Sequence, residues 1–384
     1  MKIALYYPWI YLKSGVERTI LEMVNSSRHE FTIFTNHYEP LNTYVEYRDL
    51  KIIALADIPV ERSYPKVCYA AFKIITQKIS MNNYDALMVA SEGLGDFIVF
   101  RNHCPKIPII CYCHTPLKIT HDNITRQIYL DKHQFKKPFF IFFEKIFRLL
   151  DKIAWRRYAY IFCNSQEVKN RILKAKLAPE TNIEILHPGV DSTSIKPTWQ
   201  YDNYFLQPSR IKWYKNTALA VEAFKKFYHE NPGLRKFKLI IASQVDKASQ
   251  SYYEYLLALS KDIENIQIIP NPDDELYKNL FQNAYAILHT AFNEDWGIVP
   301  LEAMAYGKPV IAVNQGGPAE SIIDKETGFL VNPNAQEFSK AMKTLAEDIK
   351  LTQEIGKNAR TASLKYDWKN FVKRIDSYFD SLLL

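Results

Sequence analysis

The chain has 384 residues, of which 47% are hydrophobic, so it is too long for one typical domain and too apolar for general disorder. Its net charge of +7 suits an anionic ligand or surface, but without a recognition motif it does not indicate a nucleic-acid-binding protein. The five irregularly spaced cysteines favour reduced thiols in a cytoplasmic protein, and no signal peptide, membrane-spanning helix or metal site is predicted.

Short apolar segments alternate with helical segments along the whole chain. In the first half, strands are predicted at residues 2–7, 31–36, 86–91, 108–114, 160–165 and 183–188. In the second half, they are predicted at residues 204–209, 238–243, 266–271, 286–290, 309–314 and 328–333. Strands that are apolar throughout are typical of parallel sheets with helices on both faces. The pattern therefore predicts an α/β fold with two doubly wound, Rossmann-like domains.

The segment 188–197, PGVDSTSIKP, is rich in Pro, Gly, Ser and Asp and is predicted to be a linker. It separates a first domain, residues 1–190, from a second domain, residues 191–365. The remaining residues, 366–384, are predicted to form a helix that begins near Asp367. Ligands of doubly wound sheets bind at the carboxyl ends of the strands, so the expected site is a central cleft that both domains face.

Residues 14–18, SGVER, form a glycine turn between the first strand and a helix. The first N–H groups of a helix have no partner inside it, so the turn around Gly15 suits an anion or a sugar hydroxyl. The turn lacks the full G-x-G-x-x-G pattern, and the chain has no Walker P-loop. A nicotinamide-dependent dehydrogenase is therefore not indicated.

Residues 132–157 form an insertion with eight Lys or Arg, two acidic residues and seven Phe or Trp. A helical apolar stripe is predicted at Phe139, Phe143, Ile146, Phe147, Leu150 and Ile153. Two interpretations remain open. The helix could dock on the domain core, or its aromatic and basic flank could rest on an anionic membrane surface.

The segment SRIKWYKN places Arg210 and Lys215 just after the strand at residues 204–209. Two cations at the carboxyl end of a strand are suited to a diphosphate. Arginine can bind two oxygens through its planar fork, and lysine supplies a point charge. A solvated basic loop is the alternative interpretation.

Residues 294–302, EDWGIVPLE, follow the strand at residues 286–290 and carry two glutamates eight positions apart. A helix is predicted to begin near Pro300, so that a turn folding back brings Glu294 and Glu302 to one site. The positive end of the helix dipole would assist anion binding there. The backbone N–H groups expected to point at the anion are those of Gly297, Ile298 and Val299.

Together these motifs resemble the retaining GT-B glycosyltransferases of glycosyltransferase family 4, also called the group 1 type. The resemblance covers nearly the whole chain. It is carried by the E-x7-E of residues 294–302, the R-x4-K of residues 210–215, and the segments GGPAESIIDKETGFLV, NSQEVKNRI, HPGVD and SGVER. The chain has Ser14-Gly15 where many members have two glycines, and Ala242-Ser243-Gln244 where members often have G-x-G.

The resemblance implies an acceptor-binding first domain, a nucleotide-sugar-binding second domain and a C-terminal helix that crosses back to the first. It implies that Arg210 and Lys215 clamp the diphosphate, that Glu302 binds the ribose and that Glu294 meets the transferred sugar. The implied catalytic residues are Glu294, His114, Arg210 and Lys215. The implied donor-binding residues are Gly15, Arg210, Lys215, Glu294, Gly297, Ile298, Val299 and Glu302.

The implied activity is that of a retaining hexosyltransferase acting on a glycan or lipid-linked saccharide in surface polysaccharide or glycoconjugate synthesis. The segment CYCHTP resembles that of members that build bacterial or archaeal surface polysaccharides, and mannosyltransferases that use GDP-mannose are among them, which makes mannose a candidate for the hexose. No cofactor is expected beyond the nucleotide-sugar cosubstrate, and no Asp-x-Asp occurs that would hold a metal ion. The expected location is the cytoplasm, peripheral to the membrane if residues 132–157 contact lipid. A non-catalytic sugar-nucleotide-binding subunit remains the alternative.

Overall fold

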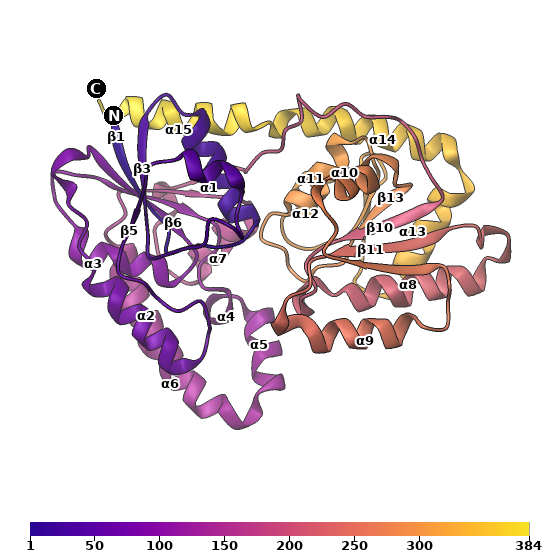
Figure 1. The fold of residues 1–384 in the computed structure, drawn as a ribbon, viewed down its shortest axis with the longest axis horizontal. Coiled ribbons are helices and arrows are strands. Elements are labelled where there is room, and N and C mark those ends of the chain that lie inside the picture. The colour runs from indigo at the N-terminus through magenta and orange to yellow at the C-terminus, as the bar shows by residue number, and fades with distance from the viewer. Residues whose placement is uncertain (384) are drawn as a thin grey trace. The chain divides into compact units, whose positions relative to one another are not determined.

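The structure of the protein, a computed structural model, describes residues 1–383 and, at Lys132, the backbone alone. By its contacts the chain divides into two compact units (Figure 1). Unit 1 comprises Met1–Pro188 and Lys369–Leu384, and unit 2 comprises Gly189–Trp368. The division falls at the start of the Pro- and Gly-rich segment 188–197, where few side chains contribute to either core.

Unit 1 is built on a seven-stranded parallel sheet in the order β5-β3-β1-β6-β7-β8-β9. The strands are β1 Lys2–Tyr6, β3 Glu30–Thr35, β5 Ile52–Ala54, β6 Ala86–Ser91, β7 Ile109–Cys113, β8 Tyr160–Cys163 and β9 Ile183–Ile185. A separate pair is formed by β2 Trp9–Ile10 and β4 His37–Tyr38. All six strands predicted for this half are present. The sequence misses β2, β4 and β5 because two or three residues are too few for a periodic pattern.

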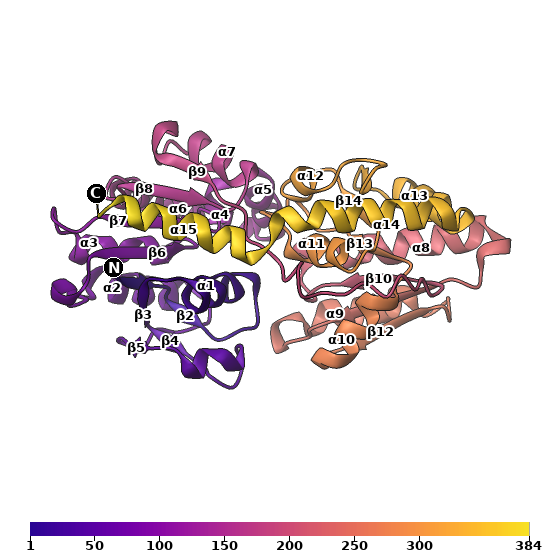
Figure 2. The same cartoon turned by 90° about the horizontal axis from the view of Figure 1, so that it is seen from above.

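Helices cover both faces of this sheet. They are α1 Gly15–Ser26, α2 Tyr64–Thr76, α3 Val99–Asn102, α4 Lys118–His121, α5 Asn123–Lys132, α6 Lys137–Trp155, α7 Gln166–Lys174 and α15 Trp368–Ser381. Alternate strand side chains such as Ala4 and Val89 share a core with α2, α6 and α7. On the opposite face lies α15, drawn in yellow in Figure 2, whose Phe371 ring is centred 5.4 Å from the ring of Tyr112.

Polar contacts also hold α15 on unit 1. Nε of Arg374 donates over 2.6 Å to Oε1 of Glu184, the middle residue of the edge strand β9. The carboxylate of Asp376 accepts from the hydroxyl of Ser27 and from the N–H of Arg28, at the end of α1. The C-terminal helix is therefore part of the unit that begins the chain.

Unit 2 is built on a six-stranded parallel sheet in the order β12-β11-β10-β13-β14-β15. The strands are β10 Tyr204–Pro208, β11 Lys238–Ser243, β12 Ile266–Pro270, β13 Ala286–His289, β14 Val310–Val313 and β15 Gly328–Val331. All six were expected from the sequence. Its helices are α8 Thr217–Glu230, α9 Gln250–Ser260, α10 Asp274–Asn283, α11 Ile298–Ala305, α12 Pro318–Ser321, α13 Ala335–Glu347 and α14 Ile349–Ser363.

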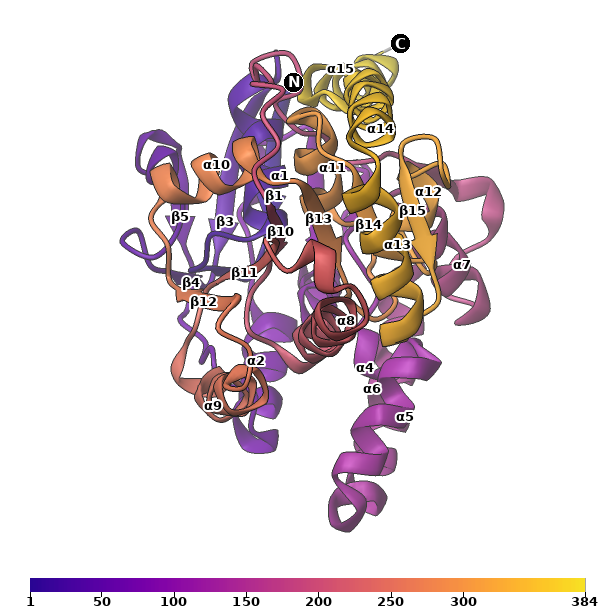
Figure 3. The same ribbon diagram turned by 90° about the vertical axis from the view of Figure 1, so that its right-hand side faces the viewer.

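Two apolar layers enclose the sheet of unit 2. Phe224 of α8 and Met342 of α13 pack on one face, against Leu239 and its neighbours. Helices α10 and α11 lie on the other face (Figure 3). There Phe281 of α10 and Met304 of α11 join the second apolar cluster. Both sheets are thus parallel and doubly wound, and the predicted fold is confirmed. The strand order reverses between β1 and β6 in unit 1 and between β10 and β13 in unit 2.

The insertion at residues 132–157 differs in detail from its prediction. It forms the end of α5, a short 3-10 turn and α6, and Figure 3 shows the α5–α6 hairpin extending from unit 1. The predicted stripe is divided between two faces of α6. Phe147 and Leu150 pack on the core of unit 1, whereas Phe139, Ile146 and Ile153 are exposed. The predicted stripe mixed core-facing and exposed residues because α6 is apolar around more than half of its circumference. The sequence therefore does not show which part of the apolar surface faces the core.

Candidate functional site

The candidate site begins where the strand order of unit 2 reverses. In doubly wound sheets, ligands bind beside the carboxyl ends of the two strands at that point. Here these strands are β10 and β13. Arg210 follows β10 by two residues and is half-buried, and the turn that continues from it ends at Lys215. The loop after β13 carries Glu294.

The central contact of the site joins these two loops. Nζ of Lys215 donates to Oε2 of Glu294 over 2.5 Å, and each side chain is 18% exposed. A charge-assisted hydrogen bond of this kind is stronger than a neutral one. A cation and a carboxylate are thereby fixed at the carboxyl edge of the sheet with part of their surface open to a ligand.

The backbone beneath this pair is also tied between the two strands. The hydroxyl of Thr290 donates to the carbonyl oxygen of Lys215 over 3.0 Å, and the N–H of Phe292 donates to the carbonyl oxygen of Tyr214 over 2.9 Å. Asn216 adopts a left-handed conformation with φ of 52°, which allows the turn to pass directly into α8. The position of Lys215 is therefore set by β13 as much as by its own strand.

Two consecutive glycines support the loop that carries Glu294. The N–H of Gly317 donates to the carbonyl oxygen of Glu294 over 2.9 Å. A Cβ added at Gly316 would lie 2.1 Å from that same oxygen, and one added at Gly317 would lie 2.1 Å from the carbonyl oxygen of Trp296. Only glycine permits this close approach of two backbones. The Gly316-Gly317 turn thus holds Glu294 toward Lys215.

The helix of the EDWGIVPLE segment begins earlier than predicted. α11 starts at Ile298 rather than near Pro300, and Gly297 precedes it in a left-handed conformation with φ of 92°. The N–H groups of Gly297, Ile298 and Val299 therefore belong to the first turn, where donors have no partner within the helix. Glu302 lies one turn further on, half-buried on the same helix. The prediction placed the start too late because proline favours the first turn but does not mark its first residue.

One residue of this site was missed by the sequence analysis. His289, the last residue of β13, is buried, and its Nε2 lies 3.7 Å from Oε2 of Glu294. Burial lowers the pKa of His289 to about 4, so the imidazole is neutral at physiological pH. His289 ends a short apolar strand in AILHT, much as His114 follows one in CYCHTP, but His114 was predicted through the family resemblance and no motif marked His289.

The two remaining predicted site residues belong to unit 1. Gly15 is the first residue of α1, and Ser14 caps that helix, because the Ser14 hydroxyl accepts from the N–H of Val16. One of the expected free donors is therefore used by the serine that replaces a glycine. His114 follows β7 and is 5% exposed, with its ring centred 5.0 Å from that of Tyr112. A role of Gly15 and His114 in the same site as Lys215 stays a prediction.

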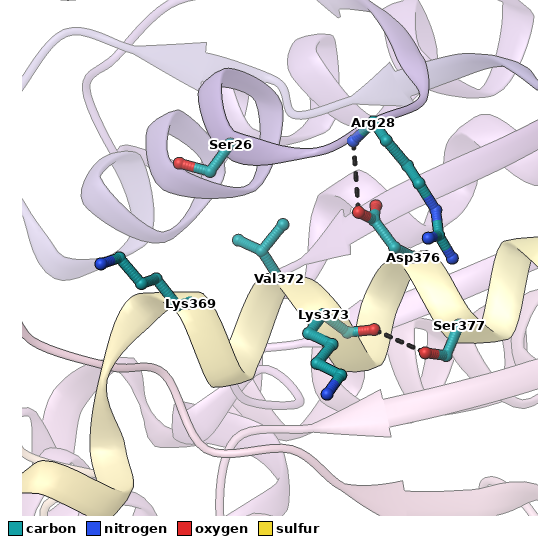
Figure 4. Close-up of a pocket in the computed structure, with 7 residues that line it drawn as sticks. All are labelled: Ser26, Arg28, Lys369, Val372, Lys373, Asp376 and Ser377. Atoms are coloured by element: carbon teal, nitrogen blue, oxygen red, sulfur yellow. Dashed lines mark hydrogen bonds between the residues drawn. The ribbon is translucent and has the colours of Figure 1, made fainter.

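A separate recess in unit 1 lies away from the strand ends used above. It has a volume of about 250 Å³ and lies between the end of α1 and α15 (Figure 4). Its lining residues are Ser26, Arg28, Lys369, Val372, Lys373, Asp376 and Ser377. Ser26 precedes β3, so the recess is at the amino ends of the strands, opposite to the edge where doubly wound sheets bind ligands. We assign no function to it.

Comparison with known families gives matches over most of the chain. Residues 13–194 match the model described as "Glycosyltransferase Family 4", and residues 194–362 match the model described as "Glycosyl transferases group 1". The two matches meet at residue 194, close to the division between the two units.

Individual relatives are similar in sequence over most of this chain. The chain is 27% identical to the alpha-1,3/1,6-mannosyltransferase alg-2 of Neurospora crassa, over 85% of this chain and 79% of that protein. It is 26% identical to the alpha-1,3/1,6-mannosyltransferase ALG2 of Mus musculus, over 96% of this chain and 94% of the relative. It is 24% identical to the alpha-1,3/1,6-mannosyltransferase ALG2 of Dictyostelium discoideum, over 100% of this chain and 98% of that protein.

Solved structures share the fold. Anabaena Alr3699/HepE, crystallised in complex with UDP and glucose, superimposes with a TM-score of 0.75 at 18% identity, over 99% of this chain and all of that chain. Sucrose-phosphate synthase (tll1590) of Thermosynechococcus elongatus superimposes with a TM-score of 0.76 at 16% identity, over 100% and 99% of the two chains.

Proposed function

We propose that this chain, which belongs to glycosyltransferase family 4 and has its GT-B fold, is a retaining mannosyltransferase that uses a nucleotide-sugar donor. The matched relatives are named alpha-1,3/1,6-mannosyltransferases, which supports mannose as the transferred sugar. The observation that carries the proposal is the Lys215–Glu294 pair at the strand-order reversal, beside the start of α11.

Donor binding is assigned to unit 2. The positively charged side chains of Arg210 and Lys215 would bind the diphosphate, together with the N–H groups at the start of α11. Glu302, one turn further along α11, would accept hydrogen bonds from the two ribose hydroxyls. Glu294 would accept hydrogen bonds from hydroxyls of the sugar, since Lys215 already fixes its carboxylate.

The proposed chemistry is stabilisation of a leaving group rather than proton transfer by a carboxylate. When the bond from the anomeric carbon to the diphosphate breaks, negative charge grows on the phosphate oxygens, and fixed cations and backbone N–H groups stabilise it. The acceptor hydroxyl would attack on the face from which the diphosphate leaves, which retains the anomeric configuration, and its proton would pass to the departing phosphate. The chain lacks an Asp-x-Asp sequence, and the two cations would take the place of a metal ion.

We further propose a lipid-linked saccharide acceptor and peripheral contact with an anionic membrane on its cytoplasmic face. Among residues 1–383, no helix combines the length and the apolar composition needed to cross a bilayer. However, α6 and the turn before it expose one apolar stripe. Its members are Phe135, Phe139, Phe142, Ile146, Leu149 and Ile153.

The charges around this exposed stripe favour an anionic surface. The only two acids of residues 133–157 are Glu144 and Asp151, and both are buried. Exposed cations border the stripe at Lys136, Lys137, Lys145, Lys152 and Arg156. An amphipathic helix with aromatic rings on one side and basic residues at its flank is the composition that binds the interface of anionic membranes.

A donor screen tests the proposed activity. GDP-mannose is expected to raise the melting temperature of the protein more than UDP-, ADP- or dTDP-sugars, because a ligand stabilises a protein by RT ln(1 + [L]/Kd). The variant Lys215→Met should lose most of this shift, whereas Lys212→Met is a matched control, since Lys212 lies in the same turn but pairs with Asp246. No shift with any nucleotide sugar would contradict the proposal.

A further inference from the structure

Unit 1 carries a carboxylate that the proposed donor site does not use. Residues 86–99 run through β6 and a 3-10 helix, and every side chain in this run is buried except that of Glu92. Glu92 directly follows β6, at the edge of the sheet where the strand order reverses between β1 and β6. It is therefore at the position in unit 1 that corresponds to the donor site of unit 2.

The Glu92 carboxylate is held in place by a buried phenol. Tyr7 directly follows β1 and is 5% exposed, and its hydroxyl donates to Oε2 of Glu92 over 3.0 Å. The buried Tyr7 is held by its own backbone bond to the carbonyl oxygen of Phe34, so its hydroxyl cannot follow a mobile side chain and orders the glutamate. A group that is ordered in advance loses less conformational entropy when it binds a ligand.

The same turn is fixed against the segment that carries His114. Ser91 pairs with Cys113 at the ends of β6 and β7, and the carbonyl oxygen of Ser91 accepts from the N–H of His114 over 3.0 Å. Glu92 and His114 are thus the first residues beyond the paired ends of two neighbouring strands. A Cβ added at Gly93 would lie 3.0 Å from Cδ1 of Leu117, so the turn after Glu92 rests directly on the CYCHTPL segment.

We propose that Glu92, ordered by Tyr7, is a binding residue for two neighbouring hydroxyl groups of the saccharide acceptor. This inference rests on the proposed function, which assigns the acceptor to unit 1. A carboxylate can accept several hydrogen bonds on its two oxygens, so the bond from Tyr7 does not prevent Glu92 from accepting others. The vicinal hydroxyls of a hexose have the spacing to donate to a carboxylate together. The role is recognition of the acceptor and not transfer of a proton.

Binding of a soluble disaccharide tests this without requiring turnover. The probe is α-mannobiose, titrated against the full chain by ligand-observed NMR. Glu92→Gln should raise its dissociation constant about tenfold, because a hydrogen bond to a charged group contributes more than one to a neutral group. Tyr7→Phe should raise it by a smaller factor. Glu46→Gln, an exposed glutamate of the same unit, is the matched control and should leave it unchanged.

A purely structural role for Glu92 predicts a different result. In that case Glu92→Gln and Tyr7→Phe would lower the melting temperature of the protein equally and leave the dissociation constant of the disaccharide unchanged, which would overturn the inference. Absence of saturable binding to the wild-type protein would overturn it as well. A third result would separate the two proposals. If the protein binds the saccharide through Glu92 but transfers no sugar from any donor, the proposed function is contradicted and the saccharide-binding role of Glu92 is supported.

Discussion

Nζ of Lys215 and Oε2 of Glu294 lie 2.5 Å apart, although 79 positions separate the two residues in the chain. The contact joins the loops after β10 and β13, the two strands between which the order of the sheet reverses. A bound diphosphate would compete with Glu294 for the ammonium group of Lys215. The pair therefore links the charge of the proposed leaving group to the carboxylate that would position the sugar.

Removal of Glu294 should separate binding from turnover. Glu294→Ala leaves the Lys215 ammonium wholly available, so the affinity for GDP should stay the same or rise. The rate of sugar transfer should fall by about 10²–10³, the usual cost of losing one group that acts on the transition state. Calorimetric titration with GDP and a steady-state transfer assay would measure the two effects. A parallel loss of GDP affinity would mean that Glu294 does not act on the sugar.

The opposite pattern is expected at Glu302. Glu302→Ala removes the acceptor for the ribose hydroxyls, so the dissociation constant of GDP should rise about tenfold or more. The matched control is Glu326→Ala, an exposed glutamate of the same unit that precedes β15. If both variants bind GDP as the wild type does, the ribose contact is made elsewhere.

The Gly316-Gly317 turn should tolerate no side chain at its first position. Gly316 has φ of 65°, and a Cβ there would lie 2.1 Å from the carbonyl oxygen of Glu294. Gly316→Ala must displace the Glu294 loop, so both transfer activity and the free energy of unfolding of unit 2 should fall, the latter by about 1–3 kcal/mol. At Gly233 an added Cβ meets nothing within 4 Å, so Gly233→Ala is the control and should leave activity intact.

Vesicle sedimentation would test the membrane surface of α6. The protein should sediment with vesicles that contain anionic lipid and should be released by salt, since each basic residue near such a surface contributes about 1 kcal/mol. Changing Lys136, Lys137, Lys145, Lys152 and Arg156 to Glu should abolish sedimentation. Arg148 is left unchanged in this variant because it binds Glu144 and the carbonyl oxygen of Thr120.

An apolar variant separates insertion from simple charge attraction. Changing Phe135, Phe142 and Leu149 to Ser should weaken sedimentation without altering charge, because all three are exposed. Tyr255→Ser with Leu257→Ser, on exposed positions of α9 in unit 2, is the matched control. Equal sedimentation of the wild type and both α6 variants would contradict membrane contact through this helix.

The buried pair His121–Asp151 should give unit 1 a measurable pH dependence. Nε2 of His121 lies 2.7 Å from Oδ2 of Asp151. Burial raises the pKa of Asp151 to about 8 and lowers the pKa of His121 to about 4, so both groups are neutral near pH 6. An acid whose pKa is raised in the folded state stabilises that state below its unfolded pKa of 3.8, and this contribution is lost as pH rises from 3.8 to about 8. The lowered pKa of His121 acts in the opposite sense between about 4 and its unfolded value of 6.5, so the net loss of stability from the pair falls above pH 6.5.

Asp151→Asn removes this titration while keeping the shape of the side chain. The melting temperature of the variant minus that of the wild type should therefore increase as the pH is raised from 5 to 8. Asp131→Asn, at an exposed carboxylate on α5, should show a difference that hardly changes over the same range. A relative melting temperature that is independent of pH at both positions would show that Asp151 is ionised in the folded protein.

The sequence predicted the sheets far better than the side-chain contacts. Strands such as Ala86–Ser91 and Val310–Val313 are buried along their whole length, so their apolar runs were unambiguous. α6 was harder, because it presents one apolar side to the core and another to the outside. A pattern of apolar residues records that a side chain avoids water, but it does not record which neighbour covers it.

The candidate site was predicted through its motifs and not through its geometry. Arg210, Lys215, Glu294 and Glu302 stood out by residue type and spacing. The pairing of Lys215 with Glu294 depends on the order of strands in the sheet, which no local pattern contains. His289 was missed for the same reason, since its nearness to Glu294 follows from how the loop after β13 folds back.

The placement of α15 has a consequence for synthesis. Unit 1 needs residues 369–383 to cover the sheet face at Tyr112 and to supply the partners of Ser27 and Glu184. These residues leave the ribosome after all of Gly189–Trp368. Unit 2 can complete its own sheet first. Unit 1 is synthesised earlier, but one apolar face of its sheet stays uncovered until α15 has been made. A nascent chain stalled after Trp368 should therefore contain a protease-resistant second half and a protease-sensitive first half.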